Sequence, residues 1–277
     1  MISKHLENIP KRVGSFVCTY RGTRSADRVN AAVQQLHRSL NNQNFDIDTN
    51  GERRALTLIA ETKPEVIFDV GSNVGQWSEF MREISPSSAI HAFEIVPSTF
   101  KRLRRRTREF DNYVINNVGL SNETGKITIS LGKHSTSSTA FKIEARKFHD
   151  NYYTDEVECD TITGKDYMAS NDIAAIDFLK IDTEGMDLRV IKGFGDKLKN
   201  VRVIQFEYGI FNISSHDLLA DFFNHLTKRG FKIGKIFPRH VDFFKYDWPK
   251  ENFYGANFLA VRKSEKDLIE KLSAYGR

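Results

Sequence analysis

A glycine-rich turn stands between a strand-like and a helix-like segment near the start of this chain's central region. The apolar run VIFDV at 66–70 carries Asp69 near its end, and GSNVG follows it directly. Gly71 and Gly75 let the backbone approach a ligand closely, and the free N–H groups of the following helix favour a carboxylate or a phosphate. The turn therefore predicts a cofactor site that fits several nucleotides, and the alternative is a tight turn without a ligand.

A carboxylate is expected one strand away from this turn. The next strand-like run ends in HAFEIVP, so Glu94 follows its apolar residues. A carboxylate at that position can accept hydrogen bonds from both ribose hydroxyls of an adenosine. The combination predicts a nucleoside cofactor, although NAD enzymes share the geometry. Asn73 stands where the second glycine of GxGxxG would be, which argues against NAD.

Three further carboxylates are expected at the ends of two later strands. Asp182 and Glu184 follow the run DFLKI, and Glu207 ends VRVIQFE. Ligands of open α/β sheets bind at the carboxyl ends of the strands, so an acid there could remove a proton from a substrate. The three could also gather a divalent cation. Alternatively, Glu184 caps the helix that starts at Gly185 and Glu207 pairs with a lysine.

His134, in the polar loop GKHSTSST, is a second candidate for the catalytic base. A lone histidine in a loop is more often simply solvated. Ser137, Ser138 and Thr139 of the same loop are candidate contacts to the cofactor or the substrate. The aromatic residues around Trp248 could form the floor of a sugar-binding pocket, or could merely pack a loop.

The elements that must position these residues form an α/β fold. Short apolar runs alternate with helical patterns from Val66 onward, which is typical of a parallel sheet covered by helices. Strands are expected at VIFDVG, AIHAFEI, YVINNVGL, DFLKID and VRVIQFEYG, with an antiparallel final pair at FKIGKIF and NFLAVRK. The stretch GKITISLGKHSTSSTAFKI suggests a hairpin over the sheet edge. Residues 1–45 are expected to be a helical extension packed on a main domain of residues 46–277.

Several of these segments together resemble the FkbM-like methyltransferases. The segments are DVGSNVG at 69–75, FEIVPS at 93–98 and LKIDTEGMD at 179–187. The resemblance implies a class I methyltransferase (Rossmann-like) fold, with a seven-stranded, mostly parallel sheet, an antiparallel last strand and flanking helices. It also implies S-adenosyl-L-methionine as cofactor. Two segments depart from the family pattern: TITGKDYM lacks the usual Leu-Asp pair, and Asp187 replaces a commoner Glu.

The resemblance also assigns the cofactor-binding residues. Asp69, Gly71, Asn73 and Gly75 would hold the methionine part, Glu94 the ribose, and Asn117 with Val118 the adenine, while Ser72, Gln76 and Ile95 complete the expected set. The expected activity is O-methyl transfer to a hydroxyl of a small molecule or glycan, of the sugar, polysaccharide or polyketide type. The alternatives are a methyltransferase of RNA or protein and a non-catalytic member of the fold.

The basic charge of the chain is only a weak pointer to a nucleic-acid partner, and a nucleic acid is not expected. The 277 residues carry 41 Lys and Arg against 36 Asp and Glu, a net charge of only +5. The basic run KRLRRRTRE at 101–109 has no interleaved aromatic residues, so a solvated helix is the favoured interpretation. No signal peptide or transmembrane run of roughly 20 apolar residues is recognised, so the cytoplasm is expected. The sequence does not predict the oligomeric state.

Overall fold

The computed structural model describes residues 2–133, 138–143, 152–255 and 257–276, with side chains from residue 11 onward. The chain divides into two compact units, Met1–Asn44 and Phe45–Arg277. The first unit contains the helices α1 (Ile2–Thr19) and α2 (Arg24–Leu40). Thr23 precedes α2, and its side-chain oxygen accepts a hydrogen bond from the backbone N–H of Ala26, which caps the helix. Within the described residues, no helix is long and apolar enough to span a bilayer.

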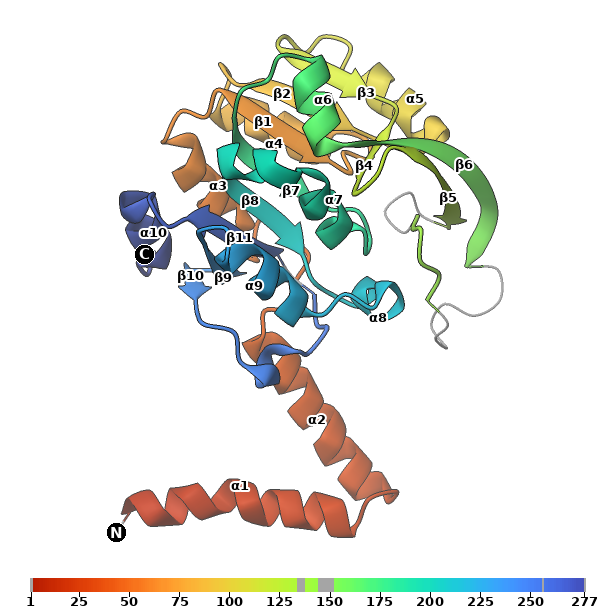
Figure 1. Cartoon of the computed structure of the whole chain (residues 1–277). Helices are drawn as coiled ribbons and strands as arrows, with labels where there is room; N and C mark the ends of the chain where they lie inside the picture. Colours follow the sequence, from red (N-terminus) through yellow and green to blue (C-terminus); the bar gives the residue numbers. More distant parts are fainter. Residues whose placement is uncertain (1, 134–137, 144–151, 256, 277) are drawn as a thin grey trace. The chain divides into compact units, whose positions relative to one another are not determined.

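The second unit is built on an eight-stranded sheet (Figure 1). Its strands in spatial order are β10 (His240–Phe243), β9 (Phe231–Phe237), β11 (Asn257–Arg262), β8 (Val201–Glu207), β7 (Ile176–Ile181), β1 (Val66–Val70), β2 (Ala89–Phe93) and β3 (Tyr113–Asn116). The strand β11 is antiparallel to both β8 and β9, as the sequence predicts for the final pair. The eighth strand, β10, was not expected, and it pairs with β9 as a short hairpin at the sheet edge.

Helices cover both faces of this sheet (Figure 1). They are α3 (Glu52–Ala60), α4 (Gln76–Ile84), α5 (Pro97–Arg106), α6 (Gly164–Ser170), α7 (Asp187–Gly193), α9 (Leu219–Thr227) and α10 (Lys266–Ser273). The short helix α8 (Phe211–Ser215) lies beyond the end of β8. Neighbouring strand residues point to opposite faces, so Phe68 packs in the core beside α6, α7 and α9, and Ile67 in the core beside α3, α4 and α10. Burying each such side chain stabilises the fold by about 2–3 kcal/mol.

A second, three-stranded sheet contains β4 (Gly119–Ser121), β6 (Tyr153–Thr163) and β5 (Gly125–Gly132), in that order. Two expectations are wrong here. The run YVINNVGL is not one strand, because its first part belongs to the main sheet and its end to the second. The long antiparallel partner of β5 is β6 rather than STAFKI, since only an isolated bridge joins Ser130 to Thr139.

Candidate active site

The glycine turn between β1 and α4 has three residues in the left-handed region. The φ angles of Gly71, Asn73 and Gly75 are +77°, +48° and +84°. A Cβ atom on Gly71 would lie 1.8 Å from the carbonyl oxygen of Asp182, so only glycine lets this turn meet the chain that leaves β7. The sequence therefore fixes the position of the turn against the loop that carries the candidate catalytic acids.

A buried ion pair between Asp69 and Lys180 stabilises the turn. Asp69 is fully buried; its Oδ1 lies 3.0 Å from Lys180 Nζ, and its Oδ2 accepts a hydrogen bond of 2.5 Å from the Ser78 hydroxyl. Lys180 also donates to the carbonyl of Gly71 at 3.0 Å. Burial opposes the charge of Lys180, but the carboxylates of Asp69 and Asp182 outweigh it and raise the pKa of its ammonium group.

Asp69 and Ser72 thus hold the turn in place rather than line the pocket. The Ser72 hydroxyl donates to the carbonyl of Asp69 at 2.6 Å and accepts from the backbone N–H of Phe93 at 3.1 Å. The exposed Gln76 begins α4 and is also absent from the pocket lining. Lys180 is thus a functional residue of this site that the sequence did not reveal, although it is the first residue of the KID segment.

Glu94 follows β2 and faces the glycine turn. Its Oε2 accepts from the backbone N–H of Asn73 at 2.9 Å, and its Oε1 accepts from that of Val96 at 2.8 Å. Burial raises the pKa of Glu94 to about 7, and the two backbone hydrogen bonds partly offset this effect. The side chain of Asn117 donates to the carbonyls of Glu94 and Ile95, so it fixes the loop after β2.

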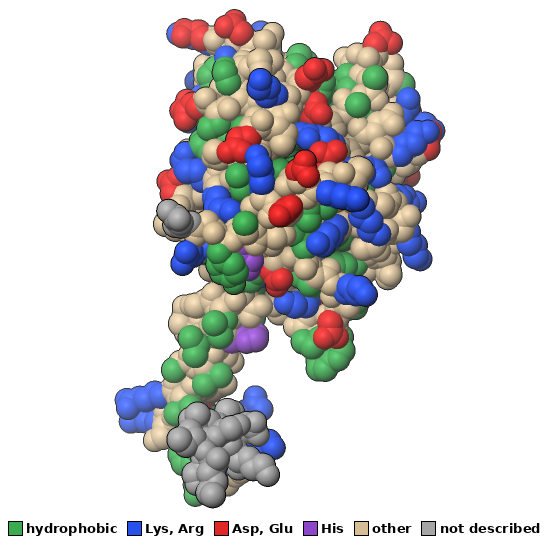
Figure 2. Space-filling view, turned by 90° about the vertical axis from the view of Figure 1, so that its left-hand side faces the viewer, with side chains coloured by type: hydrophobic (Ala, Val, Ile, Leu, Met, Phe, Trp, Pro, Cys, Tyr) green, Lys and Arg blue, Asp and Glu red, His purple; other side chains and the backbone are tan. Residues whose placement is uncertain are grey.

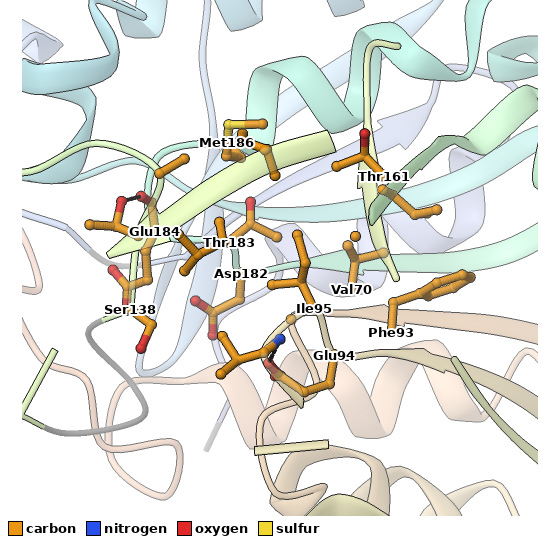
Figure 3. A pocket seen from close by; sticks show the side chains of 18 of the residues that line it. Val70, Phe93, Glu94, Ile95, Ser138, Thr161, Asp182, Thr183, Glu184 and Met186 are labelled. Carbon is orange, nitrogen blue, oxygen red and sulfur yellow. Dashed lines mark hydrogen bonds between the residues drawn. The ribbon is translucent and has the colours of Figure 1, made fainter. Parts of the chain in front are cut away.

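These elements surround a pocket of about 810 Å³ that is partly open to solvent (Figure 3). The turn, the end of β2 and the loop after β7 form one side of it, and Ile127, Ile129 and Thr161 of the second sheet form another. Gly119 and Leu120 line it, whereas the neighbouring Asn117 and Val118 do not.

Carboxylates gather at the mouth of this pocket. Asp182, Glu184 and Glu207 each have an oxygen atom within 4.8 Å of the others, and Asp182 and Glu184 line the pocket. Figure 3 shows the carboxyl groups of Asp182 and Glu94 directed toward the same space. Burial, followed by the charges of Glu207 and Asp182, raises the pKa of Glu184 well above its ordinary value. A carboxylate with a raised pKa is a stronger base than an ordinary carboxylate, which suits it to take up a proton.

Asp187, one of the two departures from the family pattern, connects the two strands that carry these acids. Its Oδ2 accepts from both the backbone N–H and the hydroxyl of Thr183, and its Oδ1 accepts from the backbone N–H of Glu207 at 2.9 Å. The residue is buried, and burial raises its pKa to about 6. Asp187 therefore fixes the loop after β7 against the end of β8.

The loop that follows β5 contributes to the same wall. Ser138 and Thr139 line the pocket, and the Thr139 hydroxyl donates to the carbonyl of Glu184 at 2.7 Å. His134 and Ser137 lie outside the described residues. The aromatic group near the end of the chain is absent from the pocket lining, and the side chain of Trp248 is exposed.

The sheet has the topology of a class I methyltransferase fold. Only β11 is reversed among its strands β1, β2, β3, β7, β8, β9 and β11, and the pocket lies at the carboxyl ends of the parallel strands. The chain belongs to the FkbM methyltransferase domain family, whose model matches residues 69–233. That span contains the glycine turn, Glu94 and the three clustered carboxylates.

Two curated proteins and one solved structure illustrate the relationship. The chain is similar to the hexuronic acid methyltransferase AglP of Haloferax volcanii, with 28% identity over 160 residues, which is 57% of this chain and 62% of AglP. It is equally similar to the 31-O-demethyl-FK506 methyltransferase FkbM of Streptomyces tacrolimicus, with 28% identity over 49% of this chain and 62% of that protein. The matches thus span less than two thirds of these relatives.

The solved structure is the methyltransferase FkbM from Methylobacillus flagellatus. It aligns with a TM-score of 0.45 and 14% identity, over 72% of this chain and 44% of that one.

Proposed function

We propose that this protein transfers a methyl group from S-adenosyl-L-methionine to a hydroxyl group of a sugar or of a polyketide-type small molecule. The observation that carries the proposal is one pocket that joins Glu94, Asn73 and the carboxylates Asp182 and Glu184. The acceptor class is supported by the two relatives, whose names specify a hexuronic acid and a demethylated FK506.

The pocket offers suitable partners for each part of the cofactor. Asn73 Oδ1 is buried and has no hydrogen-bond partner within the described residues, so it is available to the α-ammonium group of the methionine part. Glu94 would accept hydrogen bonds from the ribose hydroxyls. The apolar side chains of Ile127 and Ile129 would cover the adenine, beside Gly119 and Leu120. In this assignment Asn117 does not contact the adenine, and its side chain instead fixes the loop after β2.

When bound, S-adenosyl-L-methionine supplies an electrophilic methyl group on a sulfonium. The protein's task is then to align the acceptor oxygen with that methyl group and to take up the hydroxyl proton. We assign the proton to Glu184, because its pKa is raised and its side chain lines the pocket. Asp182 would orient the acceptor by accepting a hydrogen bond from the acceptor hydroxyl. Its Oδ2 lies 3.6 Å from Lys180 Nζ.

A divalent cation is a second candidate for activating the hydroxyl. It is supported only by the proximity of the oxygens of Asp182, Glu184 and Glu207, which lie within 4.8 Å of one another. The two modes differ in their response to a chelator. Turnover that survives EDTA treatment assigns the proton transfer to the carboxylate, whereas turnover that is lost with EDTA and restored by Mg²⁺ assigns it to the ion.

Cofactor binding is the first test. Isothermal titration of the full chain with S-adenosyl-L-methionine should show binding that is weakened by Glu94→Gln. The matched control is Glu158→Gln, because Glu158 is an exposed carboxylate paired with Lys126 on β5. If the wild-type chain does not bind the cofactor, the proposal fails.

Methyl transfer is the second test. A panel of hexuronic acids, their activated derivatives and polyketides bearing free hydroxyls should contain an acceptor that gains one methyl group by mass spectrometry. In the Glu184→Gln variant, kcat should fall by about 10²–10⁴-fold while the cofactor affinity is retained. Methylation of RNA or protein alone would overturn the acceptor class, and cofactor binding without any turnover would favour a non-catalytic member of the fold.

A further inference from the structure

The excess of positive over negative charge in this protein resides in its N-terminal unit. Residues 1–44 contain seven Lys and Arg against two Asp and Glu, a net charge of +5 that equals the net charge of the whole chain. The unit Phe45–Arg277, which carries the pocket, is therefore neutral. A basic segment attached to a neutral domain indicates an anionic partner for that segment.

The same unit exposes a stripe of large apolar side chains. Val33, Leu36 and Leu40 of α2 follow one another at spacings of three and four residues, and Leu36 and Leu40 are 62% and 67% exposed. Figure 2 shows hydrophobic side chains along the length of this helix. On α1, Phe16 packs against Tyr20 just beyond the helix end with ring centroids 4.8 Å apart, and both rings are about half exposed.

The basic residues of α2 lie opposite this stripe. At 3.6 residues per turn, Arg24, Arg28 and Arg38 fall on the face of the helix away from Leu36 and Leu40. Within the described part of the chain, none of the three guanidinium groups forms an ion pair. The helix is thus amphipathic, with low overall hydrophobicity, unpaired arginines on the polar face and large apolar side chains on the other.

We propose that α1 and α2 bind the surface of an anionic membrane. The apolar stripe would enter the boundary between headgroups and acyl chains, and the arginines would be attracted by the negative surface potential. A helix with side chains is about 10–12 Å thick, which is close to the Debye length at physiological salt, so the arginines of the outer face still sense the lipid charge.

Two other partners for this surface fit the observations less well. A second copy of the chain would bring another unit with the same charge of +5 against the first, and the two would repel each other. A nucleic acid would satisfy the arginines but leave Leu36 and Leu40 exposed to water. An anionic bilayer satisfies both features, and this inference does not depend on methyl transfer.

Sedimentation with lipid vesicles tests the proposal on the full-length protein. The wild-type chain should bind vesicles of phosphatidylcholine mixed with phosphatidylglycerol, bind vesicles of phosphatidylcholine alone much more weakly, and dissociate as salt is raised. Each arginine contributes at most about fivefold to the affinity at this distance, so the triple variant R24Q/R28Q/R38Q should lose up to about 100-fold. The variant L36S/L40S should also lose binding, with α-helical circular dichroism and cofactor affinity unchanged.

The matched control removes the same charge from the neutral unit. Lys101, Arg104 and Arg105 of α5 line a groove on that unit, and K101Q/R104Q/R105Q should bind vesicles as the wild type does. The proposal is overturned if the wild type fails to bind the mixed vesicles, or if this control loses as much affinity as the α2 variant. It is also overturned if light scattering finds a dimer that L36S/L40S dissociates.

Discussion

Replacing Lys180 with methionine should destabilise the protein strongly and distort the cofactor turn. The side chain of Lys180 is 5% exposed, and its Nζ lies 3.0 Å from the fully buried carboxylate of Asp69 and 3.0 Å from the carbonyl of Gly71. Methionine fills a similar volume but leaves the charge of Asp69 without its partner. Breaking a buried ion pair on one side costs about 3–5 kcal/mol of unfolding free energy.

The variants K180M and D69N and their combination form a double-mutant cycle that measures this interaction. D69N should cost less than K180M, because Lys180 retains Asp182 at 3.6 Å and the carbonyl of Gly71. The double variant should be more stable than the sum of the single losses predicts, since neither charge is then left alone. Urea unfolding followed by tryptophan fluorescence is a suitable assay, because Trp77 lies 5.8 Å from Lys180 Nζ.

The exposed pair Lys126–Glu158 provides the control. Lys126→Met should change the unfolding free energy by less than about 1 kcal/mol, because solvent screens this pair. If K180M loses no more than this control, or if the effects of K180M and D69N are additive, then the buried pair does not support the turn and the reasoning is wrong.

Three further predictions concern the same site. Burial raises the pKa of Glu94 from 4.5 to about 7, so protonation of this carboxylate should weaken cofactor binding about tenfold per pH unit below 7. Cofactor affinity measured against pH tests this. An affinity that does not change with pH in the wild type, or that falls equally steeply in E94Q, would contradict it. The same shift makes the free protein less stable as the pH rises from 4.5 to 7. Gly71→Ala should cost more than about 2 kcal/mol and abolish cofactor binding, because its Cβ would overlap a carbonyl at 1.8 Å, whereas Gly125→Ala, where a Cβ meets no atom within 4 Å, should be tolerated. Asp187→Asn should lower the melting temperature through a loss of about 1–3 kcal/mol, because the amide keeps only one acceptor oxygen and its NH2 group then faces a donor, either Thr183 or the backbone N–H of Glu207. An unchanged melting temperature would rule out this role.

The main sheet was predictable because its strands carry the strongest sequence signal. Nearly continuous apolar runs such as DFLKI and VRVIQF are largely buried on both faces, and their order with the intervening helices predicts a parallel sheet. The second sheet was predicted poorly. Its long strand β6 reads YTDEVECDTIT, in which exposed polar residues alternate with partly buried ones, so its pairing with β5 depends on contacts distant in sequence.

The candidate site divides in the same way. The turn and Glu94 are recognisable because glycines at fixed spacing and an acid after an apolar run are local signals. The role of Lys180 is not recognisable from the sequence, because a lysine inside a strand gives no sign that its buried partner, Asp69, lies 111 residues earlier. The hydrogen bonds of Asn117 to two backbone carbonyls are likewise a property of the folded loop, which is why the side chain was expected to bind adenine instead.

The second sheet has a consequence for redesigning the pocket. The part of β5 that lines the pocket packs in a small separate cluster with Val96 and Cys159, whereas Leu120 of β4 belongs to the main core. The loop after β7 is tied through Lys180 and Asp187 to the buried centre of the fold. Substitutions in that loop would therefore change stability together with chemistry. The side chains of Ile127 and Ile129 can therefore be varied with less risk to folding, so libraries that aim to change how the pocket holds the adenine under the proposed function should begin there.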